Sequence, residues 1–165
     1  MLNDFLATLQ NTPLAAAMRG DVGSVWLFPT VETIHVMAIA TVVGSIVMVD
    51  LRLLGVSSRN SSVLTLSAEI LPVTWIAFLI AALAGTAMFV SKAHTYFHNS
   101  MFQLKFVCMF LAGVNMLAFH LGAYRKVLEW DSKLPPPLPA RLAGVLSLML
   151  WIGVVAFGRW VGFTT

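Results

Sequence analysis

Three ionisable side chains next to or inside apolar stretches are the residues of this chain best suited to chemistry. His35 lies inside the first stretch, Lys105 just before the third, and Arg159 just after the fourth. Charge is costly at membrane depth, so such residues point to function. Imidazole nitrogen is a common ligand of haem iron, whereas lysine and arginine hold carboxylates. We therefore predict a cofactor site with His35 as metal ligand and with Lys105 and Arg159 holding a haem propionate or a quinone oxygen.

A polar cluster is expected around these three residues. Glu32 precedes His35 by three residues, so the two side chains share one face of a helix. The connection between the second and third apolar stretches adds polar side chains on the same side of the membrane: His94, Tyr96, His98 and Asn99. Groups from three helices at one depth favour a binding site over isolated polar contacts.

His120 is a further cofactor-binding candidate at another depth. With a rise of 1.5 Å per residue, it lies about 15 Å deeper than His35. Two histidines that bind one haem iron must reach it at nearly one depth, so this pair fits only if the helices are staggered. The alternative is an interfacial histidine that pairs with Asp50. Sulfur atoms at suitable depths offer other second ligands: Met37, Met88, Cys108 and Met109.

Four stretches without charged residues must position these side chains, and each is nearly as long as a bilayer is thick. A helix needs about 20 apolar residues to cross about 30 Å of hydrocarbon. We expect spans at about 28–50, 70–90, 101–124 and 140–163. Leu2, Phe5, Leu6 and Leu9 form an amphipathic pattern, which predicts a short interfacial helix within residues 2–19. The proline-rich stretch Leu134–Pro139 is expected to be extended.

Composition agrees with this arrangement. Hydrophobic residues make up 59% of the 165 residues and charged residues 10%, against about 25% charged in soluble domains. The sequence therefore predicts an all-α integral membrane four-helix bundle, a single domain over residues 1–165 that contacts the lipid bilayer. The basic residues lie at span ends rather than in one patch, which argues against a nucleic-acid partner. The single cysteine excludes an internal disulfide.

The distribution of lysine and arginine predicts the orientation. Six of the ten lie near the first and third connections, and four lie on the side of the termini. Because positive residues collect on the cytoplasmic side, both termini are expected in the periplasm of a bacterial inner membrane.

Short motifs along nearly the whole chain resemble an uncharacterised bacterial family of four-span inner-membrane proteins. The matching pieces are Glu32-Thr33-Ile34-His35, Gly44-Ser45, Asp50-Leu51-Arg52-Leu53-Leu54-Gly55, Pro72-Val73-Thr74-Trp75, Gly85-Thr86, Asn99, Lys105, Asn115, Phe119-His120, Trp130-Asp131 and Gly158-Arg159. The family carries no established activity that the resemblance could transfer.

The layout is more distantly similar to two other groups, the membrane module of copper-resistance D proteins and the haem-containing, J-type protoporphyrinogen oxidase. The oxidase resemblance implies haem b and a porphyrinogen substrate, with His35, Lys105 and His120 matching its histidine, lysine and second histidine. The copper-resistance resemblance implies soft ligands near the outer face.

Three hypotheses about function remain open. The first is a haem b protein that takes part in membrane electron transfer or quinone-linked oxidoreduction. The second is a structural or accessory subunit without a cofactor, within a homo-oligomer or a larger complex. The third is a copper-handling protein, in which methionines, Cys108 and the outer histidines bind Cu(I).

Overall fold

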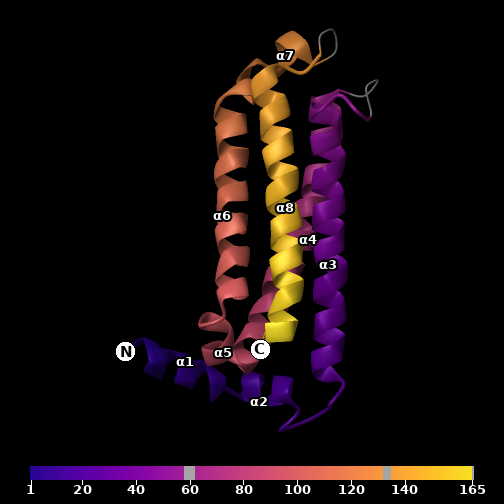
Figure 1. Cartoon of the computed structure of the whole chain (residues 1–165). Helices are drawn as coiled ribbons and strands as arrows, with labels where there is room; N and C mark the ends of the chain where they lie inside the picture. Colours follow the sequence, from indigo (N-terminus) through magenta and orange to yellow (C-terminus); the bar gives the residue numbers. More distant parts are fainter. Residues whose placement is uncertain (58–61, 132–134, 165) are drawn as a thin grey trace.

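Four helices in the computed structural model are long and apolar enough to cross a membrane (Figure 1). They are α3 (Leu27–Leu53), α4 (Val63–Ser91), α6 (Ser100–Leu121) and α8 (Leu138–Thr164). The structure describes residues 1–57, 62–131 and 135–164. No strand occurs in these ranges, so the predicted all-α bundle is confirmed.

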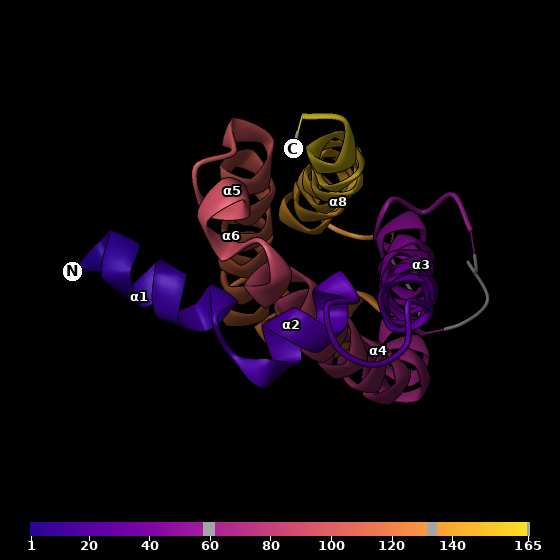
Figure 2. The ribbon, with the colours of Figure 1, turned by 90° about the horizontal axis from the view of Figure 1, so that it is seen from below.

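The four long helices form two antiparallel pairs. Helix α3 packs along α4, helix α6 packs along α8, and contacts between α3 and α8 join the pairs (Figure 2). Both termini lie at one end of the bundle, as an even number of crossings requires. We call this the termini end, and we call the opposite end the α7 end.

Three short helices lie at the termini end: α1 (Leu2–Gln10), α2 (Pro13–Arg19) and α5 (Ala93–Phe97). The region expected to hold one interfacial helix is therefore divided in two. The break occurs because Thr12 caps α2 through its hydroxyl, which accepts a hydrogen bond from the Ala15 amide at 3.3 Å, and Pro13 follows as the first helical residue. Arg19 then donates to the carbonyls of Gln10 at 2.8 Å and Ser91 at 3.3 Å, which fixes the short helices to α4.

The α7 end contains η1 (Ala123–Lys126) and α7 (Val127–Trp130), packed on a small apolar core. Its buried residues are Leu53, Val63, Val127, Trp130 and Ala140. A buried ion pair lies beside this core. Arg52 Nη2 donates to the Asp131 carbonyl at 2.8 Å and lies 3.5 Å from the Asp131 carboxylate, and both side chains are 5% exposed.

Helix α3 ends three residues later and α6 three residues earlier than expected from the sequence, and α4 and α8 begin earlier than expected. Helix α4 begins at Val63 rather than near residue 70. The Ser62 hydroxyl caps it by accepting from the Thr65 amide at 2.9 Å, and the Asp131 carboxylate accepts from the Val63 and Leu64 amides. Pro72 therefore lies inside the helix. Helix α8 begins at Leu138, so the expectation of an extended chain was wrong for Leu138 and Pro139. Proline is tolerated in a first turn because amides there have no partner within the helix.

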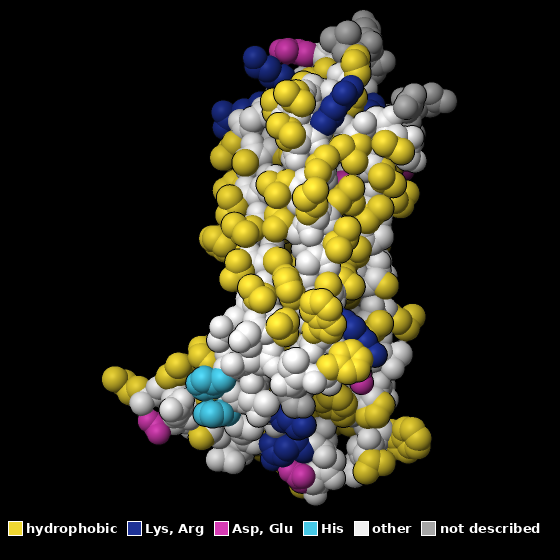
Figure 3. Space-filling view, in the orientation of Figure 1, with side chains coloured by type: hydrophobic (Ala, Val, Ile, Leu, Met, Phe, Trp, Pro, Cys, Tyr) yellow, Lys and Arg dark blue, Asp and Glu magenta, His cyan; other side chains and the backbone are white. Residues whose placement is uncertain are grey.

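The bundle leaves most of its apolar surface uncovered. In the most apolar stretch of the third span, 6% of the residues are buried inside the bundle. In each of the other three spans the buried share is 17%. Hydrophobic side chains cover the middle of the molecule, and lysine and arginine side chains collect toward its ends (Figure 3). A surface of this kind contacts lipid, so the chain is a multi-pass membrane protein.

Candidate functional site

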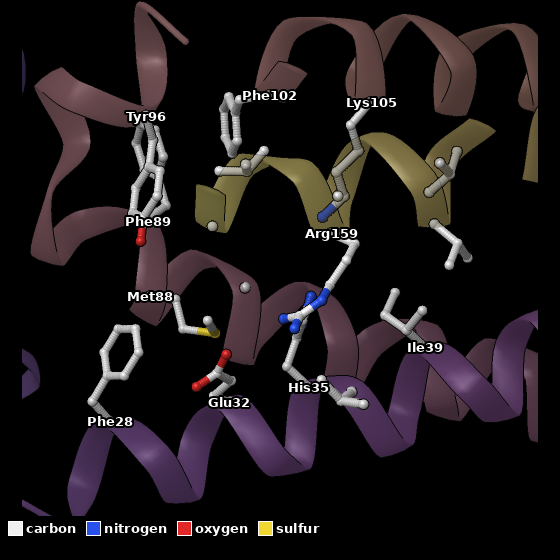
Figure 4. A pocket seen from close by; sticks show the side chains of 17 residues that line it. Phe28, Glu32, His35, Ile39, Met88, Phe89, Tyr96, Phe102, Lys105 and Arg159 are labelled. Atoms are coloured by element: carbon white, nitrogen blue, oxygen red, sulfur yellow. The ribbon is translucent and has the colours of Figure 1, made fainter. Parts of the chain in front are cut away.

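A cavity of about 490 Å³ lies near the termini end, between residues of all four long helices. We call it the termini-side cavity. His35 from α3, Lys105 from α6 and Arg159 from α8 all line it, and their side chains point toward one another (Figure 4). The residues predicted to share a site therefore do converge. Its other lining residues are Phe28, Glu32, Val36, Ile39, Gly85, Met88, Phe89, Tyr96, Phe102, Val154, Val155, Gly158, Val161 and Gly162.

The His35 ring is held by two features of α4. Its Nδ1 atom lies 2.8 Å from the Ala81 carbonyl oxygen. Because a carbonyl only accepts, Nδ1 carries the proton, and Nε2 of the neutral ring keeps its lone pair. Gly85 gives the ring space, since a Cβ atom there would lie 3.0 Å from His35 Cε1. Metal-binding histidines are commonly held by such a hydrogen bond.

The two cations reach the cavity without an acidic partner of their own. In the described part of the chain, neither Lys105 nor Arg159 belongs to an ion pair within 4.0 Å. The Lys105 side chain crosses Gly158, whose added Cβ would lie 3.5 Å from Lys105 Cδ. The Arg159 guanidinium lies 5.0 Å from the centre of the Phe163 ring. With Glu32 as the one carboxylate among the lining residues, the cavity can accept an anionic group.

Three aromatic rings form the wall nearest the short helices. Phe89 stacks on Phe102 at 5.4 Å between ring centres, and Tyr96 lies 6.4 Å from Phe89 and 6.0 Å from Phe102. Burial raises the pKa of Tyr96 above its ordinary value, and the Glu32 carboxylate adds to the rise. The phenol therefore stays protonated at neutral pH as a hydrogen-bond donor.

Of the four sulfur atoms considered from the sequence, Met88 is the one among the residues that line this cavity. Met37 is 67% exposed on the outside of the bundle. Cys108 packs against α8, where a Cβ added to Gly153 would lie 3.1 Å from its Sγ. Met109 lines a different cavity. Which sulfur atom faces the cavity depends on how each helix is rotated about its axis. The depth estimated from the sequence does not reveal that rotation.

His120 lies apart from the other predicted site residues. It lines a second cavity of about 230 Å³, which we call the α7-side cavity. Its Nδ1 donates to the Met116 carbonyl at 2.9 Å. Asp50 lines the same cavity, but the ion pairs of the described residues do not include one between His120 and Asp50. The alternative interpretation of His120 as an Asp50 partner is therefore wrong.

The described residues contain no group of three or more His, Cys, Asp or Glu positioned to hold one metal ion. A metal bound at His35 would therefore draw on a ligand of another type, such as Met88, or on a macrocycle.

Fold and site together define a class: a multi-pass membrane four-helix bundle with a positively charged cavity near one membrane face. The chain belongs to DUF6644, a family of unknown function, which matches residues 17–164. No curated protein and no solved structure matches it. The expectation that the chain belongs to an uncharacterised family is therefore confirmed. Because the function of the family is unknown, it does not indicate an activity for this protein.

Proposed function

We propose that the termini-side cavity binds haem b and that the protein takes part in electron transfer within the membrane. The observation that carries this proposal is the state of His35. Its Nδ1 proton is donated to the Ala81 carbonyl, so Nε2 would be free to hold the haem iron, in a cavity that Lys105 and Arg159 also line.

The other residues of the cavity suit the same cofactor. Lys105 and Arg159 come from different helices and can each pair with one propionate, which would neutralise charges that the bilayer would otherwise disfavour. Met88 also lines the cavity, and its thioether would be the second group to hold the iron. The stacked rings of Phe89, Tyr96 and Phe102 offer an apolar wall for a flat macrocycle.

Bound haem would supply one-electron redox chemistry, and the protein residues would set its position and polarity. His35 would fix the iron in depth, and Glu32 would balance part of the positive charge. A quinone or a membrane redox protein is the expected exchange partner, because both are reached from within the bilayer.

The absorption spectrum of the full-length protein, purified in detergent from cells supplied with haem precursor, tests the proposal. We expect a Soret band that shifts on reduction with dithionite. His35→Ala should lose the band, and added imidazole should restore it, which would show that the variant is folded. His120→Ala is the matched control, because its histidine lines the other cavity, and it should keep the band.

A colourless wild-type protein, or a band that His35→Ala retains, would overturn the proposal. Elemental analysis separates the alternatives in that event. Copper retained by a colourless protein would favour copper handling, whereas a protein without metal or pigment would favour the structural or accessory role.

A further inference from the structure

Asp50 is a buried acid with unusual surroundings near the end of α3. The residue is 5% exposed. The Ser147 hydroxyl forms a hydrogen bond with its carboxyl group, whereas Oδ2 has no hydrogen-bond partner in the described chain. None of the ion pairs of the described residues includes Asp50.

These contacts favour the uncharged form of the Asp50 side chain. A carboxylate taken out of water needs a counter-ion or several hydrogen-bond donors, and one hydroxyl is a poor substitute. The neutral acid avoids this cost, but its O–H then needs an acceptor. The Ser147 hydroxyl can serve as this acceptor within the protein, and so can an oxygen atom of a ligand in the cavity that Asp50 lines.

That space is the α7-side cavity, which Asp50 lines. Its volume of about 230 Å³ exceeds by several times the roughly 30 Å³ share of one water molecule. The titratable groups that face it besides Asp50 are His120 from α6 and Tyr124 from η1, and α4 and α8 contribute none. The wall is mainly apolar, with a few hydroxyl and amide groups: Ser45, Ser67, Thr74, Asn115 and Ser147.

Two tryptophans make the cavity suitable for a ring compound that arrives from lipid. Trp75 and Trp151 both line it. Trp75 is also 57% exposed on the outside of the bundle, so the cavity borders the bilayer. An apolar space with a few polar groups in its wall is typical of ligand-binding sites.

We propose that the α7-side cavity binds an uncharged, membrane-soluble ring compound through a carbonyl oxygen that accepts a hydrogen bond from the Asp50 carboxylic acid. This site does not depend on haem at His35, because it uses another cavity and other residues. A bound metal cation is the competing occupant, and it would require a charged carboxylate.

Quenching of tryptophan fluorescence by tetramethyl-1,4-benzoquinone measures binding to the detergent-purified full-length protein. We expect saturable quenching that is lost in a Trp75→Phe/Trp151→Phe variant. Asp50→Leu, which has no donor, should weaken binding at least tenfold. Asp50→Asn is the matched control, because its amide is neutral and can still donate, and its affinity should stay within about threefold of wild type.

Reaction of the wild-type protein with dicyclohexylcarbodiimide supplies a second measurement that needs no variant. This apolar reagent modifies protonated carboxyl groups, and peptide mass spectrometry locates the modified residue. Asp50 should be modified at neutral pH and protected by the quinone. Asp131, which is paired with Arg52, is the internal reference and should stay unmodified.

Equal affinities of wild type and Asp50→Leu would overturn the proposal, as would an unreactive Asp50. Loss of quinone binding in Asp50→Asn, together with sodium-dependent quenching in wild type, would assign a cation site instead. Haem binding at His35 is measured separately, from the Soret band. The haem proposal and the proposal for the α7-side cavity can therefore fail independently.

Discussion

At the scale of single residues, the position of the His35 imidazole depends on two positions of α4 that carry no reactive group. The Ala81 carbonyl selects the tautomer, and Gly85 leaves the space that the ring occupies. The chemistry available at His35 is therefore set by a backbone oxygen and by the absence of a side chain.

Replacing Gly85 by alanine should displace this ring. The added methyl would lie 3.0 Å from Cε1, and forcing an extra carbon into a packed site costs about 1–3 kcal/mol. We expect a several-fold lower haem content per protein, measured from the Soret band and the protein concentration.

Gly44→Ala is the control for this substitution, because a Cβ at Gly44 meets no atom within 4 Å. It should leave haem content unchanged. Equal haem content in Gly85→Ala and wild type would contradict the role given to Gly85.

At the scale of elements, one buried pair joins three segments of the α7 end. Asp131 follows α7. Its backbone carbonyl accepts a hydrogen bond from Arg52 of α3, and its carboxylate lies 3.5 Å from Arg52 and accepts the first amides of α4. The Asp131 carboxylate thus caps two amides of a helix that begins 68 residues earlier in the chain.

Asp131→Ala should therefore be strongly destabilising. It removes a buried carboxylate that lies 3.5 Å from Arg52 and accepts the Val63 and Leu64 amides, and losses of about 3–5 kcal/mol are typical when one partner of a buried ion pair is removed. Unfolding in mixed micelles with increasing dodecyl sulfate measures the change in free energy of unfolding.

Asp21→Ala is the matched comparison, because Asp21 also pairs with an arginine, Arg19, but is 53% exposed. Exposed pairs contribute at most about 1 kcal/mol, so this variant should stay close to wild type. Similar losses in free energy of unfolding in both variants would show that the buried pair stabilises the protein no more than the exposed pair does.

At the scale of the whole molecule, the termini, α1, α2 and α5 all lie at one end, and the termini-side cavity lies near it. The excess of lysine and arginine toward the other end predicts that the termini face the periplasm. Two residues that entered this comparison, Arg59 and Lys133, lie outside the described ranges.

Cysteine labelling tests this orientation. In a Cys108→Ala background, Thr95→Cys should react with a membrane-impermeant maleimide in intact spheroplasts. Leu128→Cys at the α7 end, where Leu128 is 83% exposed, should react only after the membrane is permeabilised. The opposite pattern would place the termini-side cavity near the cytoplasm.

The sequence by itself determined the class of fold and the depth of the main candidates. Hydrophobic runs must be about as long as the bilayer is thick, so the four spans can be read along one dimension. Depth follows in the same way from the rise per residue. The depths estimated in this way placed His35, Lys105 and Arg159 at one level of the membrane and His120 at another.

Only the tertiary structure decided which sides of the helices face one another. Rotation about each helix axis brought Met88 into the cavity and left Met37 on the outside, although both lie at suitable depths. The hydrogen bond between Asp131 and the start of α4 joins segments far apart in the chain, and the burial of Asp50 results from the packing of several helices. Such contacts depend on how the helices pack, which hydrophobicity along a single chain does not specify.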